Sequence, residues 1–402
     1  MTLTLLIDLD DTLLANEMNT FVSAYLKALA GHMRVYAMPD QLITTLLAAT
    51  QKMMVNKRPD RTLKETFDAA FYPVLGLNSA HVRGVIDEFY ANVFPTLRSL
   101  THTQPGAVEL VEWAMGRGDR LVVATNPLFP RTAILQRLEW ADLSAQKYHF
   151  NLITSYEVFH FAKPNPAYFA EILACLGWPE GPVVVVGDDL DLDCASARSL
   201  GLSAYWITSE KEVPPNCRQL PTAKGTLAEV KPWLEAISPE KLHPTFSAPD
   251  ALIAILCSTP AALTTLTANL PGNGWSQSPR ESEWCLTEIL CHLRDVENEV
   301  NLSRLQKVIA EQNPFLPGMD TDRWAQERSY ANQSGYSALA EFMERRIQLL
   351  NLLDNLGNLD WDRPARHAIF GPTQLQELVS IIANHDRLHV QQVFRCIKNI
   401  SP

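Results

Sequence analysis

A chain of 402 residues is too long for one ordinary hydrophobic core, so two or three domains are expected. Hydrophobic residues make up 47% of the chain and charged residues 20%, which is typical of a globular protein. The formal net charge is -11 and no long run of Lys or Arg is present. We therefore expect no nucleic-acid partner, because a surface this acidic repels the phosphate backbone.

Cysteine usage and the apolar pattern set two further limits. The seven cysteines are scattered and never spaced as C-x-x-C, so neither a disulfide framework nor a thiolate zinc site is expected, and a reducing cytoplasm is the expected location. The apolar start of the chain is interrupted by Asp8, Asp10 and Asp11, which argues against a signal-peptide core. No apolar stretch approaches the roughly 18 residues of a transmembrane helix, so no membrane span is predicted.

Short apolar runs in the first half predict the strands of a parallel sheet. Strong runs lie at 3–7, 121–125 (LVVAT) and 183–186 (VVVV), and weaker runs lie at 151–155 and 203–208. Continuous apolar runs of this length are typical of strands buried on both faces. Helical patterns separate them, near 106–117, 130–139, 164–177 and 191–200. The alternation predicts an α/β doubly wound parallel sheet, with its binding residues at the carboxyl ends of the strands.

The segment between the first strand and about residue 100 has a different pattern. It shows helical periodicity without strand signals, in TFVSAYLKALAGHM, QLITTLLAATQKMM and HVRGVIDEFYANVF. We therefore predict that residues 1–14 and 100–237 form the α/β core and that residues 15–99 form a helical cap. A linker is predicted at 238–248, because prolines and small polar residues replace the periodic pattern there.

Beyond the linker, the sequence predicts helices only. Four long helical patterns lie near 250–269, 283–311, 335–356 and 372–398. They predict an all-α four-helix bundle for residues 249–402.

Four polar motifs of the first half follow predicted strands or open a predicted helix. They are Asp8-Leu9-Asp10-Asp11-Thr12, Thr125-Asn126-Pro127, Lys163-Pro164-Asn165-Pro166 and Gly187-Asp188-Asp189-Leu190-Asp191-Leu192-Asp193. Because the carboxyl ends of parallel strands meet at one edge of a sheet, we expect these residues to lie together. Carboxylates gathered in this way cannot all stay ionised without a cation. Oxygen-only ligands favour a hard ion such as Mg²⁺.

The same residue types suit attack on a phosphate ester. An attacking carboxylate needs its charge masked before it approaches a phosphate dianion, and a metal ion with Lys163 would do this. The hydroxyl of Thr125 can hold a phosphate oxygen, and a second carboxyl can protonate the leaving alcohol and then activate water. Each residue alone also has a structural explanation, since an Asp after a strand is commonly a helix cap or turn former. The four motifs in combination favour catalysis.

In order and spacing, the motifs resemble those of the haloacid-dehalogenase (HAD) superfamily over about residues 1–237. The resemblance implies a Rossmann-like core and a cap that selects small substrates and excludes water. Position by position, it implies these roles: Asp8 as the nucleophile that becomes an aspartyl-phosphate, Asp10 as the general acid/base, Thr125 and Asn126 as phosphate-binding residues, Lys163 as the lysine of motif three, Asp188 as a direct Mg²⁺ ligand and Asp193 as its outer partner. Asp8 and the Asp10 backbone carbonyl would complete the magnesium site, and Asp189 could share the outer role.

Within this superfamily, phosphate chemistry is favoured over two alternatives. The dehalogenases attack carbon, need no metal and lack the second Asp of motif one, whereas Asp10, Asp188 and Asp193 are all present. The transporting ATPases need long membrane segments. We therefore predict a Mg²⁺-dependent phosphatase that acts on a small phosphorylated metabolite, a phosphomonoester.

Three histidines of the second half fall into a metal-ligand pattern. His385 and His389 are four residues apart in a predicted helix, which places their Cβ atoms about 5–6 Å apart on one face. His292 lies in another predicted helix and could face this pair, although such a histidine alone is more often a core residue. Three histidines with an open position suit Zn²⁺, Ni²⁺ or Fe²⁺. Asp295 and Gln392 are expected to hydrogen-bond the ring nitrogens of His292 and His389 that do not bind the metal.

The second half resembles the DinB-like family, a four-helix bundle with a three-histidine metal site, over about 249–398. The segments that carry the resemblance are WCLTEILCHLRDVE (284–297), DTDRWAQERSY (320–330) and HDRLHVQQ (385–392). It implies metal binding by His292, His385 and His389. Some relatives are thiol-dependent transferases, so a low-molecular-weight thiol is a candidate partner.

Three interpretations of the second half are left open. It could be an accessory domain of the phosphatase, or it could make the protein bifunctional as a metal- and thiol-dependent transferase or hydrolase. It could also be a non-catalytic sensor or a dimerisation module that produces a homodimer.

Overall fold

The computed structural model describes residues 2–280 and 283–400, which form two compact units. The first unit comprises Met1–Lys57, Arg61–Tyr168 and Glu180–Thr245, and the second comprises Arg58–Asp60, Phe169–Pro179 and Phe246–Pro402. The main division, after Thr245, falls within the predicted linker at 238–248. Residue 1, residues 281–282 and residues 401–402, which belong to the predicted terminal domains, lie outside the described residues.

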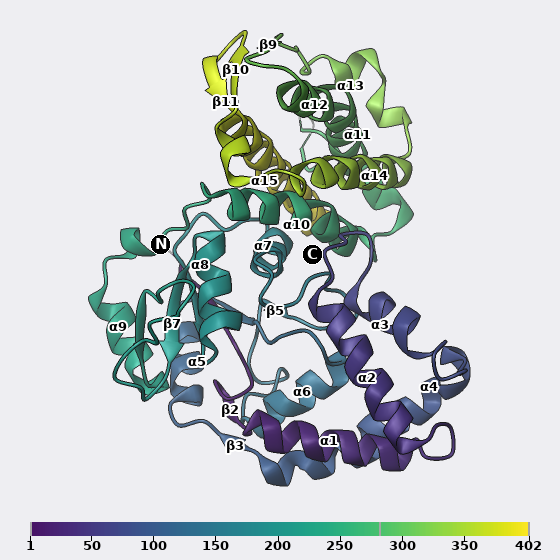
Figure 1. Cartoon of the computed structure of the whole chain (residues 1–402), viewed down its shortest axis with the longest axis vertical. Helices are drawn as coiled ribbons and strands as arrows, with labels where there is room; N and C mark the ends of the chain where they lie inside the picture. Colours follow the sequence, from purple (N-terminus) through teal and green to yellow (C-terminus); the bar gives the residue numbers. More distant parts are fainter. Residues whose placement is uncertain (1, 281–282, 401–402) are drawn as a thin grey trace. The chain divides into compact units, whose positions relative to one another are not determined.

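A six-stranded parallel sheet forms the centre of the first unit (Figure 1). Its strands are β1 (Thr4–Ile7), β4 (Arg120–Val123), β5 (Leu152–Ile153), β6 (Val183–Gly187), β7 (Ser203–Ile207) and β8 (Ala223–Gly225). They lie in the order β5-β4-β1-β6-β7-β8, and every neighbouring pair is parallel. All residues of β1, β6 and β7 are buried, as expected of strands covered on both faces. The predicted α/β parallel sheet is confirmed.

Helices follow the strands of this sheet. They are α5 (Ala107–Gly116), α6 (Arg131–Trp140), η3 (Leu190–Ala195), α8 (Ser196–Leu200), η4 (Leu227–Glu229), α9 (Val230–Ala236) and η5 (Pro239–Leu242). Helix α7 (Ala167–Cys175) comes between β5 and β6 in the sequence, and most of it belongs to the second unit. Gly201 ends α8 with a φ of 92°, a left-handed conformation that glycine adopts without a steric penalty. The edge strand β8 was not predicted, because its sequence AKG contains no apolar run.

The insertion after β1 is helical. It contains α1 (Met18–His32), α2 (Pro39–Met54), α3 (Leu63–Phe71), α4 (Ser79–Glu88), η1 (Phe89–Val93) and η2 (Phe94–Leu100). Local sequence sets these bounds: α2 begins with a proline, and α3 begins with a capping box between Thr62 and Glu65. On either side of the insertion, β2 (Leu14–Ala15) pairs antiparallel with β3 (His102–Thr103), so the chain leaves and re-enters the core at one place.

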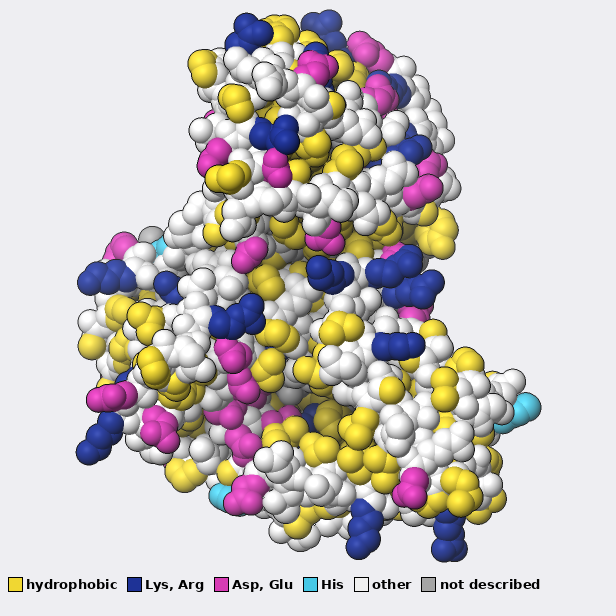
Figure 2. Space-filling model, viewed as in Figure 1, with side chains coloured by type: hydrophobic (Ala, Val, Ile, Leu, Met, Phe, Trp, Pro, Cys, Tyr) yellow, Lys and Arg dark blue, Asp and Glu magenta, His cyan; other side chains and the backbone are white. Residues whose placement is uncertain are grey.

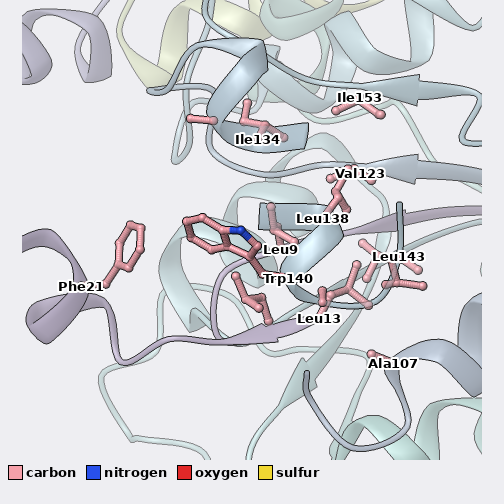
Figure 3. Packing of buried hydrophobic residues seen from close by; sticks show 14 of the residues in the cluster. Leu9, Leu13, Phe21, Ala107, Val123, Ile134, Leu138, Trp140, Leu143 and Ile153 are labelled. Carbon is pink, nitrogen blue, oxygen red and sulfur yellow. The ribbon is translucent and has the colours of Figure 1, made fainter. Parts of the chain in front are cut away.

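One continuous hydrophobic cluster joins the sheet to the insertion. Figure 3 shows Leu9, Val123 and Leu138 of the core near Trp140, the last residue of α6. The Trp140 ring lies 6.3 Å from the Phe21 ring of α1 and 5.2 Å from the Phe94 ring of η2, measured between centroids. These aromatic contacts pack the insertion against the core.

The second unit is a helical bundle, as predicted. Its long helices are α10 (Pro249–Thr267), α11 (Leu286–Val296) continuing through η7 (Glu297–Asn301) into α12 (Leu302–Ala310), α14 (Gly335–Leu353) and α15 (Leu375–Ile400). Shorter elements connect them: η6 (Gly272–Trp275), α13 (Trp324–Glu327), η8 (Tyr330–Asn332) and η9 (Asn358–Asp362). α11 packs against α14, and α10 packs against both α14 and α15.

The expectation of helices only is wrong for the second unit. β9 (Phe315–Leu316), β10 (Pro364–His367) and β11 (Gly371–Gln374) form a small sheet in the order β11-β10-β9. These strands have two to four residues, and two of them contain proline or glycine. Strands this short show no measurable alternation of apolar and polar residues, so periodicity does not reveal them.

Helix α10 departs from the expectation that no segment could cross a membrane. Of the described helices, it alone is long and apolar enough to do so by length and composition. In the most apolar 18-residue stretch of α10, 67% of the stretch is buried, as is typical of a core helix in a bundle. Its apolar composition is therefore weak evidence for a span.

A buried ion-pair network connects the long helices. Arg346 of α14 binds both carboxylate oxygens of Glu297, at 2.5 and 3.0 Å, and Asp386 of α15, at 2.5 and 3.2 Å. Its guanidinium also donates to the carbonyl oxygen of Leu256 in α10, at 3.0 Å. All three charged side chains are inaccessible or nearly so. One arginine thus contacts a residue from each of the other three long helical segments.

We expect Arg346→Met to destabilise the second unit, because it leaves two carboxylates buried without a counter-charge. Removal of one partner from a buried pair costs about 3 kcal/mol. Calorimetry of the full chain should show one transition lowered by roughly 6–12 °C. The matched control is Arg345→Met, one residue earlier on the same helix, where the guanidinium donates to Gln348 near the surface. Equal melting of both variants and the wild type would contradict a structural role for the network.

Candidate functional site

The loop after β1 is held in shape by Asp11. Its φ is 53°, and its carboxylate accepts hydrogen bonds from the backbone N–H groups of Asn16, Glu17 and Met18, at 3.0, 3.0 and 3.3 Å. A carboxylate that takes several N–H groups fixes the path of a loop. Asp11 therefore has a structural use, and the loop it stabilises presents Asp8 and Asp10.

Asp8, Lys163 and Asp193 meet in a buried group at the end of the sheet. The ammonium group of Lys163 donates to Asp8 Oδ1 at 2.6 Å and to Asp193 Oδ1 at 2.5 Å. With Asp188, the two aspartates offer carboxylate oxygens that all lie within 4.8 Å of one another. Motifs one, three and four are therefore in one place.

The turn after β6 positions Asp188 and Asp193. A Cβ on Gly187 would lie 2.2 Å from Asp193 Oδ2, so only glycine lets this carboxylate approach the strand end. Asp188 accepts a hydrogen bond from the Thr12 hydroxyl at 3.1 Å, which connects motif four to motif one. The Asp189 side chain instead caps η3, because it accepts the backbone N–H groups of Asp191 and Leu192.

The carboxylates of this group outnumber its cationic side chains. Burial raises the pKa of Asp8 well above its usual value, against the opposing effect of Lys163. Burial and the neighbouring Asp193 raise the pKa of Asp188 to about 7. Although burial lowers it, Asp193 and Asp8 raise the pKa of Lys163 well above its ordinary value. Three carboxylates facing one ammonium leave two negative charges when all are ionised, and this excess matches one divalent cation.

Asp10 is bound by a cation of its own, Arg137 of α6. Arg137 Nη1 lies 2.7 and 2.6 Å from its two oxygens, and the Asn16 side chain donates to it at 2.7 Å. Neither Arg137 nor Asn16 was predicted from the sequence to be a site residue. A signal for Arg137 exists, because it follows Ala133 and Ile134 by one helical turn and so lies on the buried face of α6.

The residues of motif two support the lysine. Asn126 Oδ1 accepts the backbone N–H of Lys163 at 3.1 Å, so this side chain orients the loop of motif three. Thr125 is buried, and its carbonyl oxygen accepts the hydroxyls of Thr154 and Tyr168 at 2.7 and 2.8 Å. These bonds fix the backbone that carries the Thr125 hydroxyl.

The three predicted histidines of the second unit converge. His385 Nε2 lies 3.1 Å from His292 Nε2 and 3.1 Å from His389 Nε2. Nitrogens at this separation fit around one ion with metal–nitrogen bonds of about 2.0–2.1 Å. Burial and the other histidines lower the pKa of His292 to about 3 and that of His389 to about 4. The His292 and His389 rings are therefore neutral at ordinary pH, the form that binds a metal.

Of the two predicted partners of the histidines, Gln392 forms a hydrogen bond with its histidine and Asp295 does not. Gln392 Oε1 lies 2.8 Å from His389 Nδ1, where it fixes the ring and leaves Nε2 free to bind. The expectation for Asp295 is wrong, because among the described residues His292 Nδ1 has no hydrogen-bond partner. The Asp295 carboxylate instead accepts from Arg294, Arg328 and Tyr330.

A cavity of about 470 Å³ opens beside the histidines. Its wall includes Trp284, Glu283, Arg395 and Cys396, which were not predicted to belong to the site. The Trp284 ring stacks parallel to the His389 ring, with centroids 6.3 Å apart. The cavity gives a small molecule access to the histidine nitrogens.

Two family models match the chain. One is described as haloacid dehalogenase-like hydrolase and matches residues 2–201, and the other is described as DinB superfamily and matches residues 256–393. The chain joins a haloacid dehalogenase-like hydrolase domain to a DinB superfamily domain. Both resemblances predicted from the sequence are confirmed.

A curated relative and several solved structures are similar to parts of the chain. Haloacid dehalogenase-like hydrolase domain-containing protein 3 of Danio rerio is 36% identical over 73 residues, which are 17% of this chain. The chain thus spans 30% of the length of this relative.

Among the similar solved structures, a dehalogenase and a phosphatase resemble the hydrolase domain, and a four-helix bundle protein resembles the DinB domain. A 2-haloacid dehalogenase of Pseudomonas syringae is 22% identical over 58% of this chain and 99% of its own, with a TM-score of 0.42. A HAD phosphatase of Thermococcus onnurineus is 19% identical over 58% and 98%, with a TM-score of 0.39. YfiT of Bacillus subtilis, described as a probable metal-dependent hydrolase with an unusual four-helix bundle topology, is 21% identical over 42% and 87%, with a TM-score of 0.31.

Proposed function

We propose that the hydrolase domain is a Mg²⁺-dependent phosphohydrolase that acts on a small phosphomonoester, with Asp8 as its nucleophile. The observation that carries the proposal is the excess of two negative charges in the group of Asp8, Asp188, Asp193 and Lys163. Hard carboxylate oxygens at this spacing suit Mg²⁺. When bound there, the ion would neutralise charge on the phosphate and on the attacking carboxylate.

The reaction balances with two aspartates and one water. The Asp8 carboxylate attacks phosphorus as the bond from phosphorus to the ester oxygen breaks, and the leaving alcohol takes a proton from the Asp10 carboxyl. Asp10, now ionised, takes a proton from water as the water oxygen attacks the aspartyl-phosphate. The bond from phosphorus to Asp8 breaks, inorganic phosphate leaves, and both aspartates return to their first state.

The surrounding residues support these two aspartates. Lys163, 2.6 Å from Asp8, would bind a phosphate oxygen once substrate is present, and the Thr125 hydroxyl would bind another. Arg137 and Asn16 orient Asp10 toward the leaving oxygen. Asn126, which was predicted to bind phosphate, acts in this proposal by positioning the Lys163 loop.

Dehalogenation is the competing reaction for this fold. Attack on carbon needs no divalent cation, so a dehalogenase has no use for a buried group with two uncompensated charges. The acidic group therefore favours phosphate over carbon as the atom attacked.

We expect Asp8→Asn to lose phosphate release by at least about a thousandfold, because an amide is a poor nucleophile toward phosphorus. The assay is phosphate release from a panel of phosphomonoesters, with Mg²⁺ and with a chelator. Asp191→Asn, an exposed change in the same motif, is the matched control and should retain wild-type rates. Full activity of Asp8→Asn, or wild-type turnover that survives the chelator, would refute the mechanism.

We infer that the DinB domain binds one divalent transition metal through His292, His385 and His389. The supporting observations are the convergence of three Nε2 atoms and the neutral state of the buried rings. The adjacent cavity of about 470 Å³ favours a catalytic domain over a sensor or a dimerisation module, because it brings a small molecule to the open side of the ion. A low-molecular-weight thiol is a candidate for that molecule.

We expect the purified wild-type chain to contain about one Zn²⁺, Ni²⁺ or Fe²⁺ per molecule, and His385→Asn to contain little, because two imidazoles bind far more weakly than three. Elemental analysis after dialysis without chelator measures this. Asn384→Ala, an exposed change on the preceding residue, controls for damage to α15 and should keep the metal. Equal metal content in both variants would show that the histidines are not the ligands.

A further inference from the structure

The hydrolase domain contains an apolar cavity of about 190 Å³ between the insertion and the loop after β4. Leu29 of α1, Leu42 of α2 and Phe71 of α3 contribute to its wall, together with Phe129 from the core. On the face shown in Figure 2, hydrophobic side chains gather beside acidic ones over this unit. Among the described residues that line the cavity, none carries a formal charge.

The few polar groups of the wall are already occupied or neutral. The hydroxyls of Tyr25 and Tyr90 lie 3.1 Å apart and bond to each other. Burial raises the pKa of both phenols, and that of Tyr72 to about 12, so they stay uncharged. A charged or heavily hydroxylated group placed here would lose its water without gaining enough hydrogen bonds.

The cavity adjoins the acidic site at two points of the chain. Met18, which lines it, donates its N–H to the Asp11 carboxylate, so the wall continues directly from the loop of motif one. The Phe129 ring lies 4.5 Å from the Arg137 guanidinium carbon, and that guanidinium holds Asp10 at 2.6 Å. The group that would protonate the leaving oxygen is therefore separated from the cavity by one side chain and one ring.

The size of the cavity limits what it can hold. An apolar cavity of about 150 Å³ in another protein is known to bind benzene. A volume of about 190 Å³ therefore suits one ring or a short branched chain, and it is too small for a sugar-nucleotide or a second domain of a protein substrate.

We propose that this cavity receives the leaving group of the substrate, and that this group is an apolar alcohol of about the size of one ring. The inference rests on the phosphohydrolase proposed above, because it places the ester phosphate at Asp8. It adds the class of substrate: a phosphomonoester that is charged at the phosphate and apolar beyond it. Burial of the ring supplies binding free energy that the phosphate alone lacks.

The test is the affinity of the full chain, in buffer with Mg²⁺, for two phosphonates that cannot be hydrolysed. Benzylphosphonate should bind at least about tenfold more tightly than hydroxymethylphosphonate, measured by calorimetry. Thr50→Phe, which fills the cavity from α2, should weaken benzylphosphonate by about tenfold and leave inorganic phosphate unchanged. Thr44→Phe, at an exposed position of the same helix, is the matched control and should behave as wild type.

A second variant tests the cavity even if Thr50→Phe fails to fold. Leu47 lines the cavity but is 49% exposed, so Leu47→Asn changes the wall without disturbing the core and should weaken benzylphosphonate severalfold. Equal affinity for the two phosphonates, or unchanged benzylphosphonate affinity in Leu47→Asn and Thr50→Phe, would overturn the proposal.

Turnover assays distinguish a failure of this inference from a failure of the proposed phosphohydrolase reaction. Tight benzylphosphonate binding without phosphate release from benzyl phosphate would refute the phosphohydrolase and leave the apolar pocket established. A different result would keep the phosphohydrolase and refute the role of the cavity. In that case phosphate would be released from glycerol phosphate as efficiently as from benzyl phosphate, and the two phosphonates would bind with equal affinity.

Discussion

Buried charge that must be neutralised is the constraint on which both domains depend. In the bundle, Arg346 binds both Glu297 and Asp386, which leaves one excess negative charge in a closed, hydrogen-bonded structural network. At the edge of the sheet, Lys163 neutralises only part of the charge of three aspartates. The bundle network, with one excess charge, connects helices, whereas the acidic site, with two, has an affinity for a divalent cation and is a candidate for catalysis.

The α/β core and the helical insertion of the hydrolase domain have different roles in the proposed reaction. The loops, turns and η3 of the α/β core provide every charged group of the acidic site, and the insertion provides most of the apolar wall beside it. Phosphate recognition then depends on electrostatics, and recognition of the leaving group depends on the shape of the cavity. The aromatic packing of Trp140 against Phe21 and Phe94 keeps the two halves together.

Sequence reasoning predicted the sheet, the helices and the meeting of the motif residues, because apolar runs and strand-end carboxylates are local signals. It missed what depends on distant packing. Arg137 reaches Asp10 across 127 positions of sequence, and no local pattern indicates that contact. Asp295 illustrates the same limit, since its spacing from His292 suggested a partner, but its carboxylate is occupied by the adjacent Arg294 and by two distant donors, Arg328 and Tyr330. The strands β8 to β11 were not predicted, because they are too short to show an alternation of apolar and polar residues.

The pairing of β2 with β3 has an evolutionary consequence. Because the chain enters and leaves the insertion through two adjacent strands, the segment between them can lengthen, shorten or be exchanged while the sheet keeps its register. The aspartates of motifs one and four reach their places through β1 and β6 alone. New substrate preferences can therefore arise by replacement of one contiguous stretch of gene, with the reacting groups inherited unchanged.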